Sequence, residues 1–377
     1  LPEIYLEDND VNERIKNINK NMEKVLNDDL FVEYPDSMIY LERTQSDGKV
    51  REGLMGIVDL EAYSYEVGSQ TPIRATEKTV IERIPPRVKV RENALLELPH
   101  IMILIDDEKK DIIENLKNEV NEEDVVYDFD LMQNGGHIKG YKLSNNVINE
   151  VNTKLEALAN KDYFEKKYNV KNKGVLLFAM GDGNHSLATA KACYEKLKET
   201  LSEEEYDKLM ENLNDDEYLN HPSRYALVEL VNLHSSALEF EAINRVVFNV
   251  DSNDLINKLK EFYEISTDGN GEEFEIVTKD LDEVWYIKNP KSNIAVGSIQ
   301  IFLDEYLKNN NGKIDYIHGD DVTKELAREG NVGFIFKPMK KEELFKTVIL
   351  DGALPRKTFS MGHSYDKRYY LEARKIK

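Results

Sequence analysis

Cysteine is nearly absent from this chain: Cys193 is the only one among 377 residues. A single thiol excludes an intramolecular disulfide and a metal site built from several thiolates. It only weakly favours a protein that works in a reducing cytoplasm. Cys193 lies in a helical pattern, where a small buried apolar residue is the default, so we do not take it as a nucleophile.

Long apolar runs and an excess of positive charge are also missing. No stretch approaches the ~20 apolar residues that span a bilayer, and no signal-peptide pattern is present. The 50 Lys and Arg against 72 Asp and Glu give a net charge of −22, a field that repels nucleic-acid phosphates and anionic membranes. We therefore expect a soluble cytoplasmic protein whose partner is a small anionic ligand, with no nucleic acid and no membrane. The sequence leaves the oligomeric state open.

Hydrophobic periodicity predicts an α/β (or α+β) fold with mixed sheets and flanking helices. Helices are expected at 10–27, 109–120, 146–158, 184–198, 202–213, 255–263, 301–307, 323–328 and 341–348. Strands are expected at 38–43, 54–60, 100–105, 125–129, 137–143, 174–180, 225–232, 245–250, 314–318 and 332–336. Pro85-Pro86 and 267–273 read as loops. The acidic segment 214–217 suggests a first α/β domain at 1–215 and a second at 216–377.

The junction after the apolar run 175–180 is the strongest candidate site. A buried strand runs into Gly181-Asp182-Gly183 and then into a helix that starts near Asn184. The glycines permit a sharp turn, and the exposed N–H groups of the helix start suit a phosphate or carboxylate. We expect Gly181, Gly183, Asn184 and Ser186 to bind the ligand, and Asp182 and His185 to carry any chemistry. A plain strand-to-helix turn, with glycine for geometry and Asn for capping, is the alternative.

Basic side chains gather locally despite the acidic total. Arg74 and Arg87 belong to a stretch between residues 74 and 91 in which Lys and Arg outnumber Glu. Arginine binds phosphate or carboxylate with a fork of donors, so we expect these two residues to neutralise the ligand's charge. A solvated basic face that pairs with neighbouring acids is the alternative.

Several motifs together resemble one family. The segment 181–191 is similar to the signature of the bacterial and archaeal family called domain of unknown function 1015. Three more segments are similar to the same family: 53–60, 221–232 and 354–358. The resemblance covers nearly the whole chain. Family members carry a further N-terminal segment, so we expect part of the N-terminus to be missing here.

The family resemblance also suggests one more residue. Thr76-Glu77-Lys78 resembles the family's acidic segment, and Glu77 is our candidate general base. A more distant likeness is to the ParB/sulfiredoxin-like fold, which includes free-serine kinases. In those proteins an Asp-Gly-His-His-Arg turn at a helix start holds nucleotide phosphates. Here Asn184-His185-Ser186 replaces His-His-Arg, so the phosphate-binding arginine would have to come from another segment.

Histidine spacing indicates no zinc site. No pair has the i, i+4 spacing of a helical zinc motif, and no cysteine assists. His318-Gly319-Asp320-Asp321 is the best remaining arrangement for Mg²⁺, since a strand end followed by acids can present carboxylates. Acidic surface turns are common, so we assign no metal ligand.

Three functions are compatible with these residues. The first is phosphotransfer to a small metabolite, with a nucleotide and Mg²⁺ as cofactors. The second is a non-catalytic sensor of a small anion that uses the same groove. The third is a metal-dependent hydrolase, which the net charge and the lack of paired metal-ligand motifs disfavour.

Overall fold

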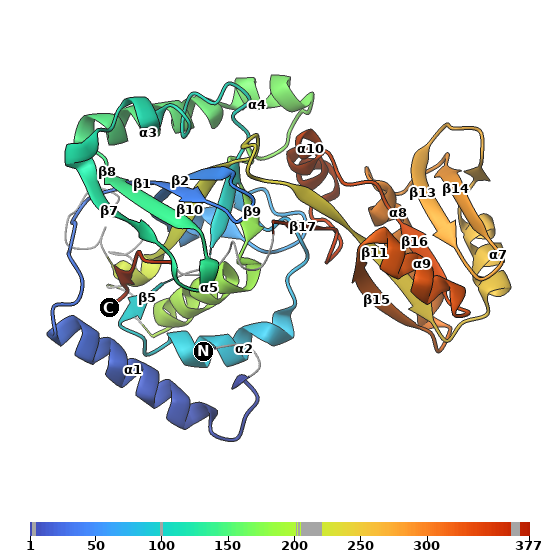
Figure 1. Cartoon of the computed structure of the whole chain (residues 1–377), viewed down its shortest axis with the longest axis horizontal. Coiled ribbons are helices and arrows are strands. Elements are labelled where there is room, and N and C mark those ends of the chain that lie inside the picture. Colours follow the sequence, from blue (N-terminus) through green and yellow to red (C-terminus); the bar gives the residue numbers. More distant parts are fainter. Residues whose placement is uncertain (2–4, 99–100, 201, 203, 205–220, 363–369) are drawn as a thin grey trace. The chain divides into compact units, whose positions relative to one another are not determined.

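The computed structural model describes residues 1, 5–98, 101–200, 202, 204, 221–362 and 370–377. They divide into two compact units. The first unit comprises Leu1–Ala75, Thr79–Leu238 and Ser364–Lys377; the second comprises Thr76–Lys78 and Glu239–His363. Helices flank mixed sheets, which confirms the predicted mixed α/β class (Figure 1). The predicted domain boundary at residue 215 and most of the helix predicted at 202–213 lie outside the described residues.

The first unit is organised around a nine-stranded sheet in the order β3-β4-β9-β6-β10-β2-β1-β8-β7. Its strands are β1 (Ile39–Thr44), β2 (Val50–Asp59), β3 (Tyr63–Ser64), β4 (Ile73–Arg74), β6 (Met102–Ile105), β7 (Val125–Asp130), β8 (His137–Lys142), β9 (Phe178–Asp182) and β10 (Tyr225–Asn232). The family-like segments 53–60 and 221–232 form the antiparallel pair β2–β10. A small second sheet joins β5 (Leu96–Glu97) to β18 (Arg374–Lys375).

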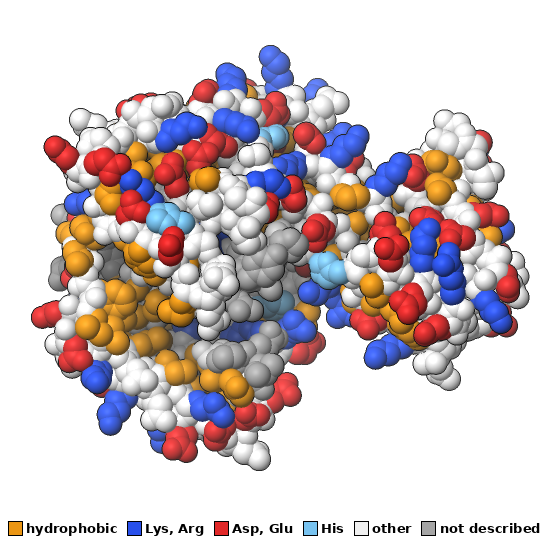
Figure 2. Space-filling view, viewed as in Figure 1, with side chains coloured by type: hydrophobic (Ala, Val, Ile, Leu, Met, Phe, Trp, Pro, Cys, Tyr) orange, Lys and Arg blue, Asp and Glu red, His pale blue; other side chains and the backbone are white. Residues whose placement is uncertain are grey.

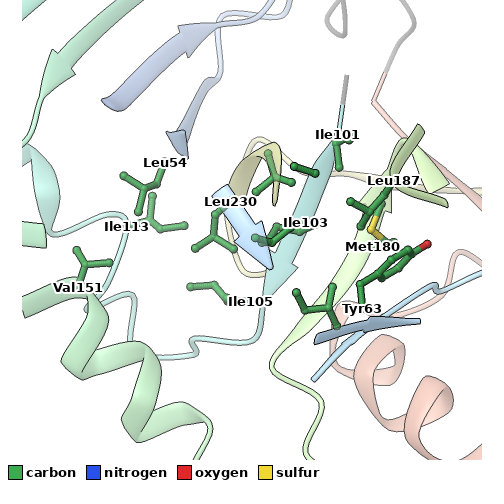
Figure 3. Close-up of a cluster of buried hydrophobic side chains, with 14 of the residues drawn as sticks. Leu54, Tyr63, Ile101, Ile103, Ile105, Ile113, Val151, Met180, Leu187 and Leu230 are labelled. Atoms are coloured by element: carbon green, nitrogen blue, oxygen red, sulfur yellow. The ribbon is translucent and has the colours of Figure 1, made fainter. Parts of the chain in front are cut away.

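Two helices, α3 and α5, contribute side chains to the core on one face of this sheet, here called the helix-covered face. The first unit contains α1 (Val11–Asn27), α2 (Ile84–Arg91), α3 (Asn145–Leu158), α4 (Lys161–Tyr168) and α5 (Asn184–Lys198). Figure 3 shows Leu54, Ile103 and Leu230, from three neighbouring strands, in the cluster that also contains Val151 of α3 and Leu187 of α5. Strand side chains alternate between faces, so these strands project their intervening residues to the other side. We call that side the opposite face.

The opposite face is partly polar. Met55 and Leu227 form a small apolar cluster there with Leu41. Beside it lies the ion pair of Arg51 with Glu229, whose side chains are 2% and 1% exposed. The carboxylate of Glu229 lies over Gly53, where a Cβ atom would come within 2.6 Å of Oε1. The glycine therefore makes room for the buried charge.

The second unit has its own sheet of seven strands. The order is β12-β14-β13-β16-β11-β15, and β17 pairs with β11. Its strands are β11 (Phe240–Phe248), β12 (Ile265–Ser266), β13 (Glu272–Val277), β14 (Asp282–Ile287), β15 (Lys313–His318), β16 (Val332–Ile335) and β17 (Phe359–Met361). Its helices are α7 (Ser252–Phe262), α8 (Ala295–Lys308), α9 (Asp320–Arg328) and α10 (Lys341–Asp351). Its core contains side chains such as Val246, Phe274 and Phe334, which are at most 1% exposed.

Two local predictions are wrong. Residues 109–120 contain only the short 3-10 turn Leu116–Asn118, because Asp107 accepts the N–H of Ile112 with its side chain and Lys110 adopts a positive φ of 59°. Pro85-Pro86 does not form a loop: both prolines lie in the first turn of α2, where the missing N–H costs no helical hydrogen bond.

The surface carries both signs of charge. Figure 2 shows acidic and basic side chains interspersed over the visible face of the molecule, without a large region of one sign. Within the described part of the chain, no helix is both long enough and apolar enough to cross a membrane.

Candidate functional site

The predicted strand–glycine–helix junction is present in the first unit. β9 ends at Asp182, Gly183 follows with φ +82°, and α5 begins at Asn184. The left-handed backbone at Gly183 is a conformation that other residues adopt at a cost, so glycine is favoured at this turn. The carbonyl of Gly183 accepts the N–H groups of Ser186 (2.9 Å) and Leu187 (3.0 Å). These bonds start the helix without any side-chain cap.

An irregular register turns Asp182 toward the opposite face. Asp182 pairs with Met102, whereas Met180 pairs with Ile103, so Gly181 is an extra residue in β9. Such a bulge re-aims the side chain that follows it. Asp182 therefore shares a face with its partner Met102 and not with Met180. Its Oδ1 accepts the N–H of Gly183 at 2.7 Å.

The charges on this face influence a tyrosine beside Asp182. Burial raises the pKa of Tyr370, and the negative charges of Glu229 and Asp182 raise it further, against the positive charge of Arg51. Asp182 thus lies close enough to the Arg51–Glu229 pair for both to act on one phenol. The end of β9 therefore lies between the charged side chains of the opposite face and the N-terminus of α5.

α2 and α5 pack side by side with their N-termini at the same end (Figure 1). The N–H of Val80, just before α2, donates to His185 Nε2 at 3.3 Å. At the far end, Lys196 of α5 lies 2.6 Å from Glu92, the residue that follows α2. The helices are therefore parallel, and the positive ends of both dipoles lie near His185. An anion at this point is stabilised by both.

Two buried polar atoms next to this hydrogen bond have no partner among the residues that the structure describes. They are Oδ1 of Asn184, at the first position of α5, and Oγ1 of Thr79, which precedes Val80. Buried polar atoms without partners are rare in folded proteins and each costs free energy. Their presence beside the helix start fits a site that is completed by a ligand.

The two predicted arginines lie in different environments. Arg74 is 2% exposed, and its guanidinium donates to the carbonyls of Thr71 (2.7 Å) and Val175 (3.1 Å) and to that of Gly174 (2.5 Å). These bonds tie β4 to the segment before β9 and use most of its donors. Arg87 is half-buried on α2, and its Nη1 donates to the carbonyl of Arg83. Arg87 is thus the one of the two on the helix that shares its N-terminal end with α5.

Glu77 belongs to the second unit. It forms a parallel bridge with Leu354, and Leu354 N–H donates to the carbonyl of Thr76 at 2.7 Å. Burial raises the pKa of Glu77, opposed by the main-chain N–H groups of Lys357 and Thr358. The carboxyl group therefore anchors the family-like segment 354–358. Its role as a general base stays a prediction.

The acidic turn at 318–321 is also in the second unit. β15 ends at His318, Gly319 has φ +87°, and Asp320 Oδ1 accepts the side-chain N–H of Asn244 at 2.9 Å. Across the described residues, no group of three or more His, Cys, Asp or Glu side chains is arranged to hold a metal ion.

A titratable carboxyl group in the second unit gives a pH prediction. Burial raises the pKa of Glu272 to about 7, and the nearby charges of Asp351 and Glu343 add to the shift. The folded pKa exceeds the usual value near 4.3, so ionisation is disfavoured in the folded state and stability is lost as pH rises between about 4 and 7. After a discount for partial exposure, we expect a loss of about 1–2 kcal/mol across this interval, measured by denaturant unfolding.

Two variants separate this effect from a general charge effect. Glu272→Gln keeps an acceptor for Ser298 Oγ, which donates to Glu272 at 2.7 Å, and should flatten the pH dependence. Glu273→Gln removes a neighbouring charge that pairs with Lys337 at the surface and should leave the slope unchanged. Equal slopes in all three proteins would contradict the assignment to Glu272.

Some residues of the site were not predicted. Thr79 and Val80 were missed because α2 was read as a loop, although prolines in a first helical turn are themselves a helix-start signal. Arg51 and Glu229 were missed because they lie far apart in the sequence and only the pairing of β2 with β10 joins them.

Comparison with known families agrees with the motif resemblance. Residues 1–306 match the family described as "Protein of unknown function (DUF1015)", and the chain belongs to this family. No curated protein matches the chain.

Similar solved structures are distant. A free serine kinase in complex with AMP is 11% identical with a TM-score of 0.42, over 87% of this chain and 92% of that chain. SbnI with a C-terminal truncation, from Staphylococcus aureus, is 10% identical with a TM-score of 0.40, over 82% of this chain and 83% of that chain. A conserved hypothetical protein from Pyrococcus furiosus is 14% identical with a TM-score of 0.33, over 59% and 88%. Likeness at this level does not indicate what this chain binds.

Proposed function

We propose that the first unit binds a small phosphorylated ligand, such as a nucleotide, at the N-terminus of α5. The observation that carries the proposal is the parallel pair α2–α5, joined at its positive end by the Val80–His185 hydrogen bond. Two helix starts at one point favour an anion more strongly than one. The partnerless hydroxyl of Thr79, which can donate to a phosphate oxygen, supplies a second, independent reason to expect an anion there.

Each residue of the junction has a defined part in this proposal. Gly181 and Gly183 allow the main chain to approach the phosphate closely. The main-chain N–H and the side-chain Nδ2–H of Asn184 donate to its oxygens, with the hydroxyl of Ser186, which is exposed at the same helix start. Arg87 adds positive charge from α2. Arg74 has no part in the proposal because its donors serve the fold.

Ligand binding is tested by thermal unfolding of the full chain with ATP, ADP, AMP, pyrophosphate and phosphate, each with and without Mg²⁺. A ligand at a hundred times its Kd stabilises the folded protein by about 2.7 kcal/mol, which raises Tm by several degrees. If none of these compounds shifts Tm, the proposal fails.

Asn184→Ala gives a result that a merely structural role would not. We expect the variant to bind the best compound about tenfold more weakly, because it loses a hydrogen bond to a charged group. We also expect the ligand-free protein to be up to about 1 kcal/mol more stable, because a buried polar atom without a partner is removed. Calorimetric titration and denaturant unfolding measure the two effects.

The matched control is Asn145→Ala, since Asn145 holds the same first position in α3 and is exposed. It should change neither ligand affinity nor stability by more than a few tenths of a kcal/mol. Loss of stability in Asn184→Ala, with unchanged affinity, would identify Asn184 as an ordinary capping residue.

Phosphotransfer is the form of the proposal that assigns chemistry to the site. The N-terminus of α5, from Gly183 to Ser186, is here called the phosphate seat. Asp182 lies directly before it, where its carboxylate can hold Mg²⁺ or a proton. In an enzyme, Asp182→Asn abolishes phosphate release or transfer from the bound nucleotide while metal-free binding persists. Binding without turnover in both the parent protein and the variant identifies a sensor of small anions instead.

A further inference from the structure

A cavity on the helix-covered face of the first unit lies away from the phosphate seat. It has a volume of about 340 Å³ and lies between α3 and the sheet. Its floor is formed by strand residues, among them Leu54, Val58, Ile103, Val228 and Leu230. It is lined at the start of β9 by Phe178, whereas the phosphate seat begins where β9 ends.

The cavity is unusual for its size and its lining. Protein interiors are closely packed, and a water molecule occupies about 30 Å³, so this space has room for roughly ten. The pocket is partly open to solvent, but the strand side chains of its floor offer no polar partners to the water that fills it. Water is therefore poorly stabilised here, and an apolar guest would displace it favourably.

A glycine leaves part of this space open. Gly56 lines the cavity on the same side of β2 as Leu54 and Val58, whose side chains form the floor (Figure 3 shows Leu54). A Cβ atom at Gly56 would meet only Met38, at 3.8 Å, which is an ordinary contact. Backbone strain does not require glycine here, since its φ is not among the positive values in the chain. The absent side chain is thus explained by the space it leaves.

The polar side chains of the lining sit together at the mouth. Asn152 and Glu156 lie one turn apart on α3, and both are exposed. Glu156 has no ion pair among the described residues, whereas Glu150 on the same helix pairs with Lys154 at 2.7 Å. A carboxylate at the mouth of an apolar cavity favours a guest with a positively charged head.

We propose that this cavity binds a small molecule with an apolar body and an amino head group. The body lies on the floor beside Gly56, and the ammonium group lies at the mouth beside Glu156 and Asn152. This site is separate from the phosphate seat and does not depend on the proposed function.

The test uses three probes that share one 4-phenylbutyl body: 4-phenylbutylamine, 4-phenylbutanol and 5-phenylvalerate. Binding to the full chain is followed through the methyl NMR signal of Met38, which lines the cavity, during titration with each probe. We expect the amine to bind about threefold to tenfold more tightly than the carboxylate, with the alcohol between them, as one exposed charge pair allows.

Substitutions at Gly56 and Glu156 test where the apolar body and the amino head group of the ligand lie. Gly56→Leu fills the floor and should abolish the Met38 shift for all three probes, while Gly56→Ala, which fits without a clash, weakens binding by a smaller factor. Glu156→Gln should remove the preference for the amine, and Glu150→Gln, on the same helix, should keep it. Because Glu156 is exposed, its variant remains folded even if Gly56→Leu does not.

The titrations with the three probes either support or overturn the proposal. A Met38 shift that is strongest for the amine and loses this order in Glu156→Gln supports the proposal. The absence of a Met38 shift with all three probes overturns it, as does an order of affinities that Glu156→Gln leaves unchanged. A failure of phosphate binding at α5 would leave these results unaffected.

Discussion

Replacing Glu229 by leucine is expected to destabilise the first unit by about 3–5 kcal/mol. Glu229 and Arg51 face each other across β10 and β2 with two hydrogen bonds, Nε to Oε1 at 2.9 Å and Nη2 to Oε2 at 3.0 Å. Both side chains are almost fully buried. The variant leaves the guanidinium charge of Arg51 in the interior without its carboxylate, and Arg43, also buried, adds a second positive charge nearby.

A double variant separates the cost of an orphaned charge from the worth of the pair. Arg51→Met with Glu229→Leu removes both charges and should recover most of the lost stability, since buried ion pairs are often replaced by apolar groups at little cost. Denaturant unfolding measures all three proteins. The control is Glu150→Leu, which breaks a partly exposed pair with Lys154 and should cost less than about 1 kcal/mol.

An equal loss in the single and the double variant would contradict this account. It would mean that the stability of the opposite face depends on the pair itself and not on charge balance. The same variants bear on the phosphate seat, because Asp182 and Glu229 act on one phenol, that of Tyr370. Removing Glu229 lowers the negative potential beside Asp182, so any Mg²⁺ held by Asp182 should bind more weakly.

The junction of β9 and α5 could be predicted because its signals are local. An apolar run, two glycines and a helical pattern follow one another without a gap between Val175 and Lys191. The structure begins the strand later, at Phe178, and ends it at Asp182, but the order of strand, left-handed glycine and helix is as expected. Sequence periodicity does not reveal the extra residue at Gly181, because a bulge is defined only by how the strand pairs with its neighbour.

Other features depended on contacts across the chain. The helix predicted at 109–120 failed because the side chain of Asp107 competes for a main-chain N–H group. The hairpin of β13 and β14 was missed, since β14 begins with charged residues such as Asp282 and Glu283, which weaken the alternation of a strand. The parallel packing of α2 on α5 could not be predicted, because Pro85-Pro86 had been interpreted as a loop. Local sequence patterns therefore predicted the junction of β9 and α5, but they did not predict that the N-termini of two helices meet there.

Arg245→Met is expected to destabilise the second unit by about 3 kcal/mol or more. Arg245 is 0% exposed, and burial lowers its pKa to about 10, so it stays charged at neutral pH. Its guanidinium donates to the carbonyls of Lys357 (2.9 Å), Arg356 (3.3 Å) and Ile243, and to Gln300 Oε1 (3.2 Å). Methionine fills much of the space but leaves these acceptors without donors.

The effect should centre on the family-like segment 354–358, to which both Arg245 and Glu77 are hydrogen-bonded. Hydrogen exchange followed by mass spectrometry should show protection in β17 and in the paired part of β11 falling by about a hundredfold. Arg356→Met is the matched control, since Arg356 also lies over the Tyr316 ring but is exposed. If the control loses as much protection as Arg245→Met, the buried guanidinium is not what fixes this segment.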